Sequence, residues 1–235
     1  MLDLTDRILR RVATTVVFVL AMGTAVPASA MLSEVVYDQP AGAQGYGAHF
    51  HANVNSGLAH GVMPSDFHVH SVYVTPLPNP GYMSVEVGWC WHGQSDKPTP
   101  FKAVTINSNQ VQTHKAQFSV PSTHDFSVRR LPGTYTWRFY MDGVSVFADE
   151  VFPEGLINRG YAISSSERTA VTSPWIPLLP ISNWSHAFGL QKSSATGVWS
   201  DWAGLQDYRS VFNYEPDPQY VQLKVSNTEW KCVAP

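Results

Sequence analysis

Two glutamates of this sequence stand in settings that suit acid–base chemistry, and Glu86 is the first. In Val85-Glu86-Val87-Gly88-Trp89, strand alternation places the Val and Trp side chains on one face and Glu86 and Gly88 on the other. If the apolar side chains form a core, Glu86 faces the open side of its sheet. The adjacent glycine leaves room there for a ligand to approach the backbone. The alternative is an ordinary exposed glutamate on a strand.

Glu167 is the second glutamate, and it lies in another alternating run, Tyr161 to Val171, on the same face as Tyr161 and Ser165. If Glu86 and Glu167 face each other across one sheet, each charge raises the pKa of the other. One carboxyl then serves as general acid and the other as base or nucleophile. Two alternatives stay open: both are unrelated surface acids, or Glu167 forms a structural ion pair with a nearby arginine such as Arg138.

Histidines supply a different chemistry, because two His-x-His pairs, His49/His51 and His68/His70, place both rings on one face if they lie on strands. Imidazole pairs of this kind are workable metal ligands. No carboxylate or cysteine stands at a recognisable ligand spacing beside them. We therefore predict no resident metal or other cofactor, and these four histidines are the residues that would bind one.

A third group is aromatic and lies in the Gly-containing segment around Trp199, Trp202 and Tyr208. Exposed rings beside Asp and Ser give a sugar a stacking face and hydrogen-bond acceptors, which predicts a glycan-binding surface completed by Tyr161 and Arg138. The alternative is that the segment folds over a sheet edge and buries its rings.

The elements that must position these residues are strands, because no long stretch has a 3.6-residue apolar period. Asp142-Gly143 between two alternating runs predicts a two-residue hairpin. The fold expected is an all-β, antiparallel jelly-roll sandwich of two sheets with a loop-rich C-terminal segment over residues 173–219. Seven runs of period two are the predicted strands: Val69–Thr75, Met83–Trp91, His124–Leu131, Tyr135–Met141, Val144–Val151, Tyr161–Val171 and Tyr220–Val225.

The N-terminus predicts export. Three arginines (Arg7, Arg10 and Arg11) precede an apolar run from Val12 to Val26. The small-x-small pattern Ala28-Ser29-Ala30 follows, which is typical of a cleaved signal peptide over residues 1–30. The run is shorter than the roughly 20 residues that span a bilayer, so no membrane insertion is expected after cleavage. Residues 31–235 then form one secreted, extracellular domain, a length that suits a single β-sandwich.

Charge, sequence motifs and cysteine content argue against several classes of binding partner, cofactor and catalytic group. The mature chain carries a formal charge of −4 and no Lys/Arg cluster, which argues against nucleic acid. No GxGxxG or P-loop pattern occurs, which argues against nucleotide cofactors. An even cysteine count in an exported chain predicts a Cys90–Cys232 disulfide, in preference to a catalytic thiol.

The order of these motifs resembles the concanavalin A-like jelly-roll proteins and, among them, the glutamic peptidases (eqolisins). The motifs are VEVGW, the hairpin TYTWRFYMDG and SSSERT. The resemblance implies a catalytic Gln before an x-Gly pair, where this chain has Glu86, and a catalytic Glu at Glu167. The first position departs from the family, because an ionised Glu cannot donate the hydrogen bond that a Gln gives to an oxyanion.

Two functions follow, and the residues alone favour the first. One is a lectin-like module that binds a glycan or other extracellular polymer without catalysis. The other is a secreted hydrolase that uses the Glu86/Glu167 pair on a polysaccharide or on peptide bonds. An exterior structural protein without a small ligand remains a third reading.

Overall fold

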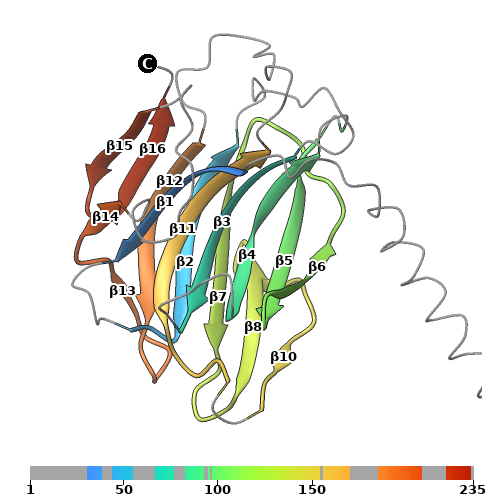
Figure 1. The fold of residues 1–235 in the computed structure, drawn as a ribbon, viewed down its shortest axis with the longest axis vertical. Coiled ribbons are helices and arrows are strands. Elements are labelled where there is room, and N and C mark those ends of the chain that lie inside the picture. Colours follow the sequence, from blue (N-terminus) through green and yellow to red (C-terminus); the bar gives the residue numbers. More distant parts are fainter. Residues whose placement is uncertain are drawn as a thin grey trace, which may run out of the picture. The chain divides into compact units, whose positions relative to one another are not determined.

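The computed structural model describes residues 31–38, 44–54, 67–76, 83–92, 95, 97–153, 156–169, 185–207 and 221–233. These residues form sixteen strands, all paired antiparallel in two sheets (Figure 1). Within these ranges no helix is long and apolar enough to cross a membrane. The all-β prediction is confirmed, while the predicted signal peptide lies outside the described residues.

The first sheet has seven strands and carries both candidate glutamates. Its order from edge to edge is β14 (Leu205–Asp207), β1 (Met31–Asp38), β11 (Tyr161–Thr169), β3 (Phe67–Thr75), β4 (Met83–His92), β5 (Thr99–Ile106) and β6 (Asn109–His114). Glu86 on β4 and Glu167 on β11 are therefore separated by the single strand β3.

The second sheet has nine strands, seven of which follow one path. That path is β10 (Glu150–Val151), β8 (Thr136–Met141), β7 (Ser122–Arg130), β2 (Gly47–Val54), β12 (Ser185–Ser193), β16 (Glu229–Val233) and β15 (Val221–Ser226). Two short strands complete the sheet, β13 (Trp199–Asp201) beside β12 and β9 (Val144–Ser145) beside β8.

One apolar core lies between the facing sides of the two sheets. The alternation predicted for the VEVGW strand is confirmed, because Val85, Val87, Trp89 and Trp91 all belong to this core. The nine-stranded sheet contributes buried aromatic side chains from the opposite side: Phe50, Phe126, Trp137, Phe139 and Trp230. Because the apolar side chains of both sheets point inward, Glu86 and Glu167 point away from the core.

A single lysine crosses this apolar layer. Lys102 on β5 is buried, and its ammonium group donates to the carbonyl of Ala148 at 2.8 Å and to the carboxylate of Glu150 on β10. It also lies 4.9 Å from the ring centre of Phe139. The contact ties the seven-stranded sheet to the nine-stranded sheet with directed polar bonds.

Six of the seven predicted strands are confirmed to within about two residues, as β3, β4, β7, β8, β11 and β15. The seventh, Val144–Val151, is interrupted: only β9 and β10 pair with β8, and Phe147 between them is buried in the core. The Asp142-Gly143 hairpin is confirmed. Both residues have positive φ, 52° and 74°, as a type I′ turn requires, and Met141 pairs with Val144 across it.

The C-terminal region holds more regular structure than the predicted loops. β12 occupies a position inside the nine-stranded sheet, between β2 and β16. A bulge between Phe188 and Gln191, where Gly189 has a φ of 61°, shifts its register against β2. The bulge breaks the period-two pattern, which is why the strand was not predicted.

The predicted Cys90–Cys232 disulfide is wrong, since the structure contains no such bond. Cys90 is buried in a small cluster with Val69, Phe101 and Ala103, outside the main core. Cys232 belongs to the main core between the sheets. The two thiols therefore occupy separate apolar clusters, and a bond between them would have to cross the seven-stranded sheet.

Candidate functional site

The outer face of the seven-stranded sheet carries the two glutamates in a fixed register. Glu86 pairs with Tyr73 on β3. Glu167 pairs with Val69, which lies four residues before Tyr73 on the same strand. The row midway between them contains Ser71, which pairs with Gly88 on β4 and with Ser165 on β11. Because residues i and i+2 of a strand share a face, all these side chains point to the same side.

The two serines link the acids. The hydroxyl of Ser71 lies 3.2 Å from that of Ser165, and both side chains are fully buried. Ser71 is also hydrogen-bonded to Glu86, and Ser165 to Glu167. A continuous polar chain therefore runs from Glu86 through two hydroxyls to Glu167. The sequence analysis offered a shared sheet face as one hypothesis for the two acids, but it gave no sign of this bridge.

Gly88 is required at the centre of this face. A Cβ at this position would lie 2.1 Å from the carbonyl oxygen of His70 and 2.7 Å from the Cα of Ser71. The glycine therefore lets β4 approach β3 closely beside the bridging serine. The glycine is therefore needed for the packing of these two strands. This role adds to the ligand access to the backbone that the sequence analysis expected.

The surroundings raise the pKa of both acids. Glu86 and Glu167 keep part of their surface exposed, while Ser71, Ser165, Val69 and Tyr73 around them are buried. Desolvation, followed by the charge of Glu167, raises the pKa of Glu86 to about 8, against a smaller opposing effect of the Ser71 hydrogen bond. Desolvation also raises the pKa of Glu167. Both carboxyls therefore keep a proton to higher pH than a free glutamate does.

Cys90 lies on the same face as Glu86 but has no chemical role there. Burial, followed by the charge of Glu86, raises the pKa of its thiol to about 12. The thiol therefore stays protonated at physiological pH, and a thiolate nucleophile is excluded at this position.

Arg138 lies away from Glu167 and forms a two-pronged ion pair with Asp149, with Nη2 to Oδ2 at 2.7 Å and Nε to Oδ1 at 2.9 Å. The alternative in which Glu167 pairs with Arg138 is therefore wrong. The arginine is held by the Asp149 carboxylate and lies on β8 of the nine-stranded sheet, whereas Tyr161 and Glu167 lie on the seven-stranded sheet. Tyr161, by contrast, is on β11 with Glu167, paired with Thr75.

The aromatic segment divides between surface and core. Trp202 is 2% exposed and packs in the main core, so it offers no face to a ligand. Trp199 on β13 is partly exposed, and Tyr208 lies outside the described residues. Of the two tryptophans, both of which the structure describes, Trp199 is the one left accessible to a ligand.

The His68/His70 pair points into the core. His68 is hydrogen-bonded to Ser166 at 3.3 Å, and both rings pack edge-on against Trp89. Desolvation, and then the charge of His186, lowers the pKa of His70 to about 3, so this ring stays neutral. These histidines form core contacts, and they are wrong as candidates for a metal site open to solvent.

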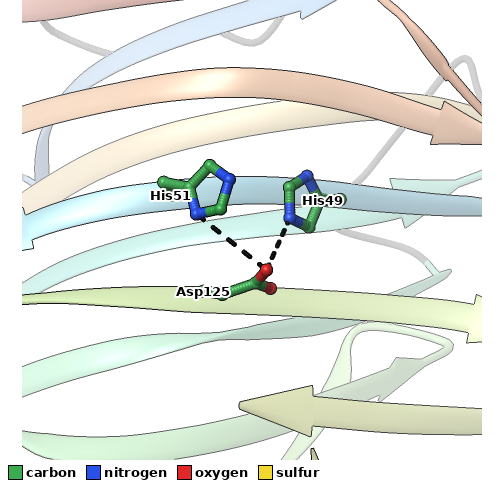
Figure 2. A group of neighbouring side chains, drawn as sticks. All are labelled: His49, His51 and Asp125. Atoms are coloured by element: carbon green, nitrogen blue, oxygen red, sulfur yellow. Dashed lines mark hydrogen bonds and ion pairs between the residues drawn. The ribbon is translucent and has the colours of Figure 1, made fainter. Parts of the chain in front are cut away.

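The other pair, His49/His51, lies on the outer face of the nine-stranded sheet beside Asp125, as Figure 2 shows. One carboxylate oxygen, Asp125 Oδ2, is 3.0 Å from His49 Nε2 and 3.9 Å from His51 Nδ1. Desolvation, followed by the charge of His49, lowers the pKa of His51. Sequence reasoning found the two histidines but missed Asp125, which is 74 residues away and enters only through the pairing of β2 with β7.

Comparison with known proteins identifies the fold. No model of a protein family matches the sequence, and no curated protein matches it. Among solved structures, Scytalido-glutamic peptidase with a peptide-based transition state analogue is 11% identical with a TM-score of 0.51. SCP-B, an eqolisin peptidase in complex with the tripeptide Ala-Ile-His, is 14% identical with a TM-score of 0.52. Both alignments cover 88% of this chain and 98% of the other chain.

The chain has the concanavalin A-like jelly-roll fold that these two peptidases share. A family 16 endo-glucanase from Bacteroides ovatus also matches, at 7% identity and a TM-score of 0.38, over 59% of this chain and 66% of its own. The resemblance inferred from the VEVGW, hairpin and SSSERT motifs is confirmed at the level of this fold. In the jelly roll, Glu86 and Glu167 are carried by one sheet and the His49/His51/Asp125 cluster by the other.

Proposed function

We propose that this jelly-roll protein is a hydrolase in which Glu86 and Glu167 share one proton. The observation that carries the proposal is the hydrogen-bonded path Glu86, Ser71, Ser165, Glu167 on one face of one sheet. Paired titratable groups whose surroundings separate their proton affinities are the usual basis of acid–base hydrolysis. The predicted export of the chain adds the proposal that it acts outside the cell.

The hydrogen-bonded chain favours a pair of acids that holds one proton. With the proton on Glu86, its carboxyl donates to Ser71, Ser71 donates to Ser165, and Ser165 donates to ionised Glu167. With both acids ionised, each serine hydrogen is drawn to its own glutamate and the contact between the serines loses its donor. A single proton therefore satisfies every member of the chain, whichever glutamate holds it. The likeness of Glu167 to the catalytic Glu of the eqolisins assigns Glu167 as the base and Glu86 as the acid.

A proton on Glu86 also compensates for the departure from the eqolisin pattern, in which a Gln stands at this position. An ionised Glu cannot stabilise a developing oxyanion, but a protonated Glu donates a hydrogen bond to it as Gln does. In the reaction, Glu167 takes a proton from water, the resulting hydroxide attacks the substrate carbonyl carbon, and Glu86 donates a hydrogen bond to the carbonyl oxygen as it becomes negative. Collapse of the tetrahedral species breaks the C–N bond, and the amine leaves with the proton held by Glu167.

Peptide bonds are the first substrate class to test, since the two solved structures described above with TM-scores above 0.5 are peptidases. The full chain is assayed against a quenched-fluorescence peptide library and against a β-glucan between pH 2 and 9. We expect peptide cleavage that falls about 10²–10⁴-fold in Glu167→Gln. Glu229→Gln is the matched control, because Glu229 is a partly buried glutamate of the other sheet paired with His186. No turnover of either substrate, or turnover unaffected by Glu167→Gln, would refute the hydrolase.

Glu86→Gln separates the two substrate classes. If Glu86 only donates a hydrogen bond, Gln keeps that donor and the variant stays active, without the loss of activity that ionisation of Glu86 causes at high pH. If Glu86 must give up its proton to a leaving group, as a glycosidase acid does, Gln cannot replace it and activity is lost. Glycan binding without turnover, weakened by Trp199→Ala, would instead favour the lectin-like binding module over the hydrolase.

A further inference from the structure

The outer face of the nine-stranded sheet holds a second group of reactive side chains that the hydrolase does not use. His49 and His51 are on β2, and Asp125 on the adjacent β7 pairs directly with His51. In Figure 2 the two rings and the carboxylate point toward one another. Their three nearest ligand atoms lie within 4.8 Å of each other. Ligands of a tetrahedral zinc ion are bound at about 2.0–2.2 Å, so small side-chain rotations bring all three onto one ion.

The ring of His49 lies between two acceptors. Its Nδ1 is 3.0 Å from the carbonyl oxygen of Gly189, and its Nε2 is 3.0 Å from Asp125 Oδ2. A carbonyl oxygen only accepts, so Nδ1 carries the hydrogen and the lone pair of a neutral ring is on Nε2. That lone pair points at a carboxylate oxygen. A protonated ring would donate to both oxygens, whereas a cation would take the Nε2 lone pair and Asp125 Oδ2 as two of its ligands. A carbonyl bonded to the far ring nitrogen is the usual support of a metal-binding histidine.

The β12 bulge serves both histidines. It presents the Gly189 carbonyl to His49, and the missing side chain of Gly189 leaves room for His51, because a Cβ there would lie 2.6 Å from His51 Cδ2. The His51 ring is stacked on Phe188 with 5.1 Å between the ring centres. Both rings are thus held by the same bulged strand, so the cluster is positioned by backbone and packing together.

The cluster opens onto a cleft of about 390 Å³. Arg129 and Tyr140 lie on the cleft wall, where the guanidinium donates to the Tyr140 hydroxyl at 3.3 Å. Trp199 and Gln191 are also part of the lining. A metal on the three ligands would keep a fourth position facing this cleft, with a cationic group nearby, which suits a water molecule or an anionic ligand.

We propose that His49, His51 and Asp125 bind one divalent cation of the zinc class, with an open fourth position in the cleft. Two imidazoles and one carboxylate with an open fourth position suit zinc, whereas calcium and magnesium prefer all-oxygen sites. The proposal is independent of the Glu86/Glu167 hydrolase, since those acids lie on the other sheet.

The test uses the full chain without a polyhistidine tag, freed of metal by chelator and titrated with ZnCl₂ by calorimetry at pH 7.5. We expect one zinc ion per chain with micromolar or tighter affinity. Co²⁺ in its place should give the intense visible absorption of a tetrahedral site. His51→Gln and Asp125→Asn should each weaken binding at least tenfold.

His114→Gln is the matched control, because the His92/His114 pair brings two rings to 5.5 Å without a carboxylate in the cluster. This variant should bind zinc as the unaltered chain does. Binding lost in His114→Gln and kept in His51→Gln would overturn the proposal, as would no binding below millimolar concentration. If Asp125→Asn folds poorly, the melting temperature decides: zinc should raise it in the unaltered chain and leave it unchanged in His51→Gln.

Discussion

The two outer faces of the jelly roll hold their reactive groups in opposite ways. On the seven-stranded sheet, Glu86 and Glu167 are surrounded by buried side chains, and desolvation dominates their chemistry. On the nine-stranded sheet, His51 and Asp125 keep 37% and 31% of their side-chain surface exposed beside an open cleft. The first face shifts the proton affinity of its acids through desolvation, whereas the second face has a cleft with space for an ion and its ligand. The same fold thus carries two groups of titratable side chains in different surroundings.

The strongest test of this comparison perturbs one face and measures both hydrolysis and zinc binding. Glu167→Gln should lower hydrolysis about 10²–10⁴-fold and leave zinc affinity unchanged. Removal of metal by chelator should leave hydrolysis within about twofold. Parallel rate and calorimetric measurements check both halves. If chelation abolishes hydrolysis, the two faces are coupled and the comparison fails.

A pair of glycines gives the next largest effect, because each face depends on one. Gly88→Ala forces a Cβ against the backbone of β3 and should lower the free energy of unfolding by about 3 kcal/mol. Gly189→Ala meets the movable ring of His51 and a positive φ, and should cost about 1–2 kcal/mol. Chemical denaturation gives the stability of both, and zinc affinity should fall in the second. Equal losses in the two variants would contradict the expectation that a Cβ against backbone atoms costs more stability than a Cβ against the ring of His51.

The pH dependence of the free energy of unfolding tests the raised pKa of Glu86 on the seven-stranded sheet. Because the pKa of Glu86 is raised in the folded chain, the folded state holds more protons than the unfolded state between about pH 4.5 and 8. Stability should therefore fall as pH rises through this window, and Glu86→Gln should reduce the fall by on the order of 2 kcal/mol. Urea denaturation at several pH values measures it. A steeper fall in Glu86→Gln would contradict the raised pKa.

Ser71→Ala should have the smallest effect, since it removes one link between the acids. The hydrogen bond from Ser71 lowers the pKa of Glu86, so its loss should move the alkaline end of the activity profile to higher pH. Turnover should fall about tenfold, the value of one hydrogen bond of roughly 1.4 kcal/mol. Ser84→Ala is the control: Ser84 is a buried serine of the neighbouring strand β4, and its loss should change neither the pH profile nor the turnover. An unchanged profile in Ser71→Ala would mean that the bridge is structural.

The elements that were predicted correctly are those whose large apolar residues alternate without interruption. The strand with Val85, Val87 and Trp89 has this pattern, and Asp142-Gly143 supplies the positive φ angles of its turn. β2 escaped prediction because it faces the core with Ala48 and Ala52 as well as Phe50, so its inner face is only partly large and apolar. Small residues on an inner face remove the contrast on which the period-two pattern depends.

The candidate sites were predicted only as far as each strand alone determines them. Alternation placed Glu86 and Glu167 on outward faces, but the bridge through Ser71 and Ser165 depends on the register of three strands. Asp125 meets His51 only through the pairing of β2 and β7. The absent disulfide has the same origin, since cysteine count says nothing about which cluster each thiol enters.

Lys102 has a mechanical consequence. Apolar contacts between two sheets are non-directional, so by themselves they permit the layers to settle at more than one offset. The bonds from the Lys102 ammonium to Glu150 and to the Ala148 carbonyl join β5 to the opposite layer at a single offset. Sliding one sheet along the other would strand a buried positive charge among aromatic rings. The lysine thus gives the sandwich resistance to shear that its apolar core alone does not provide.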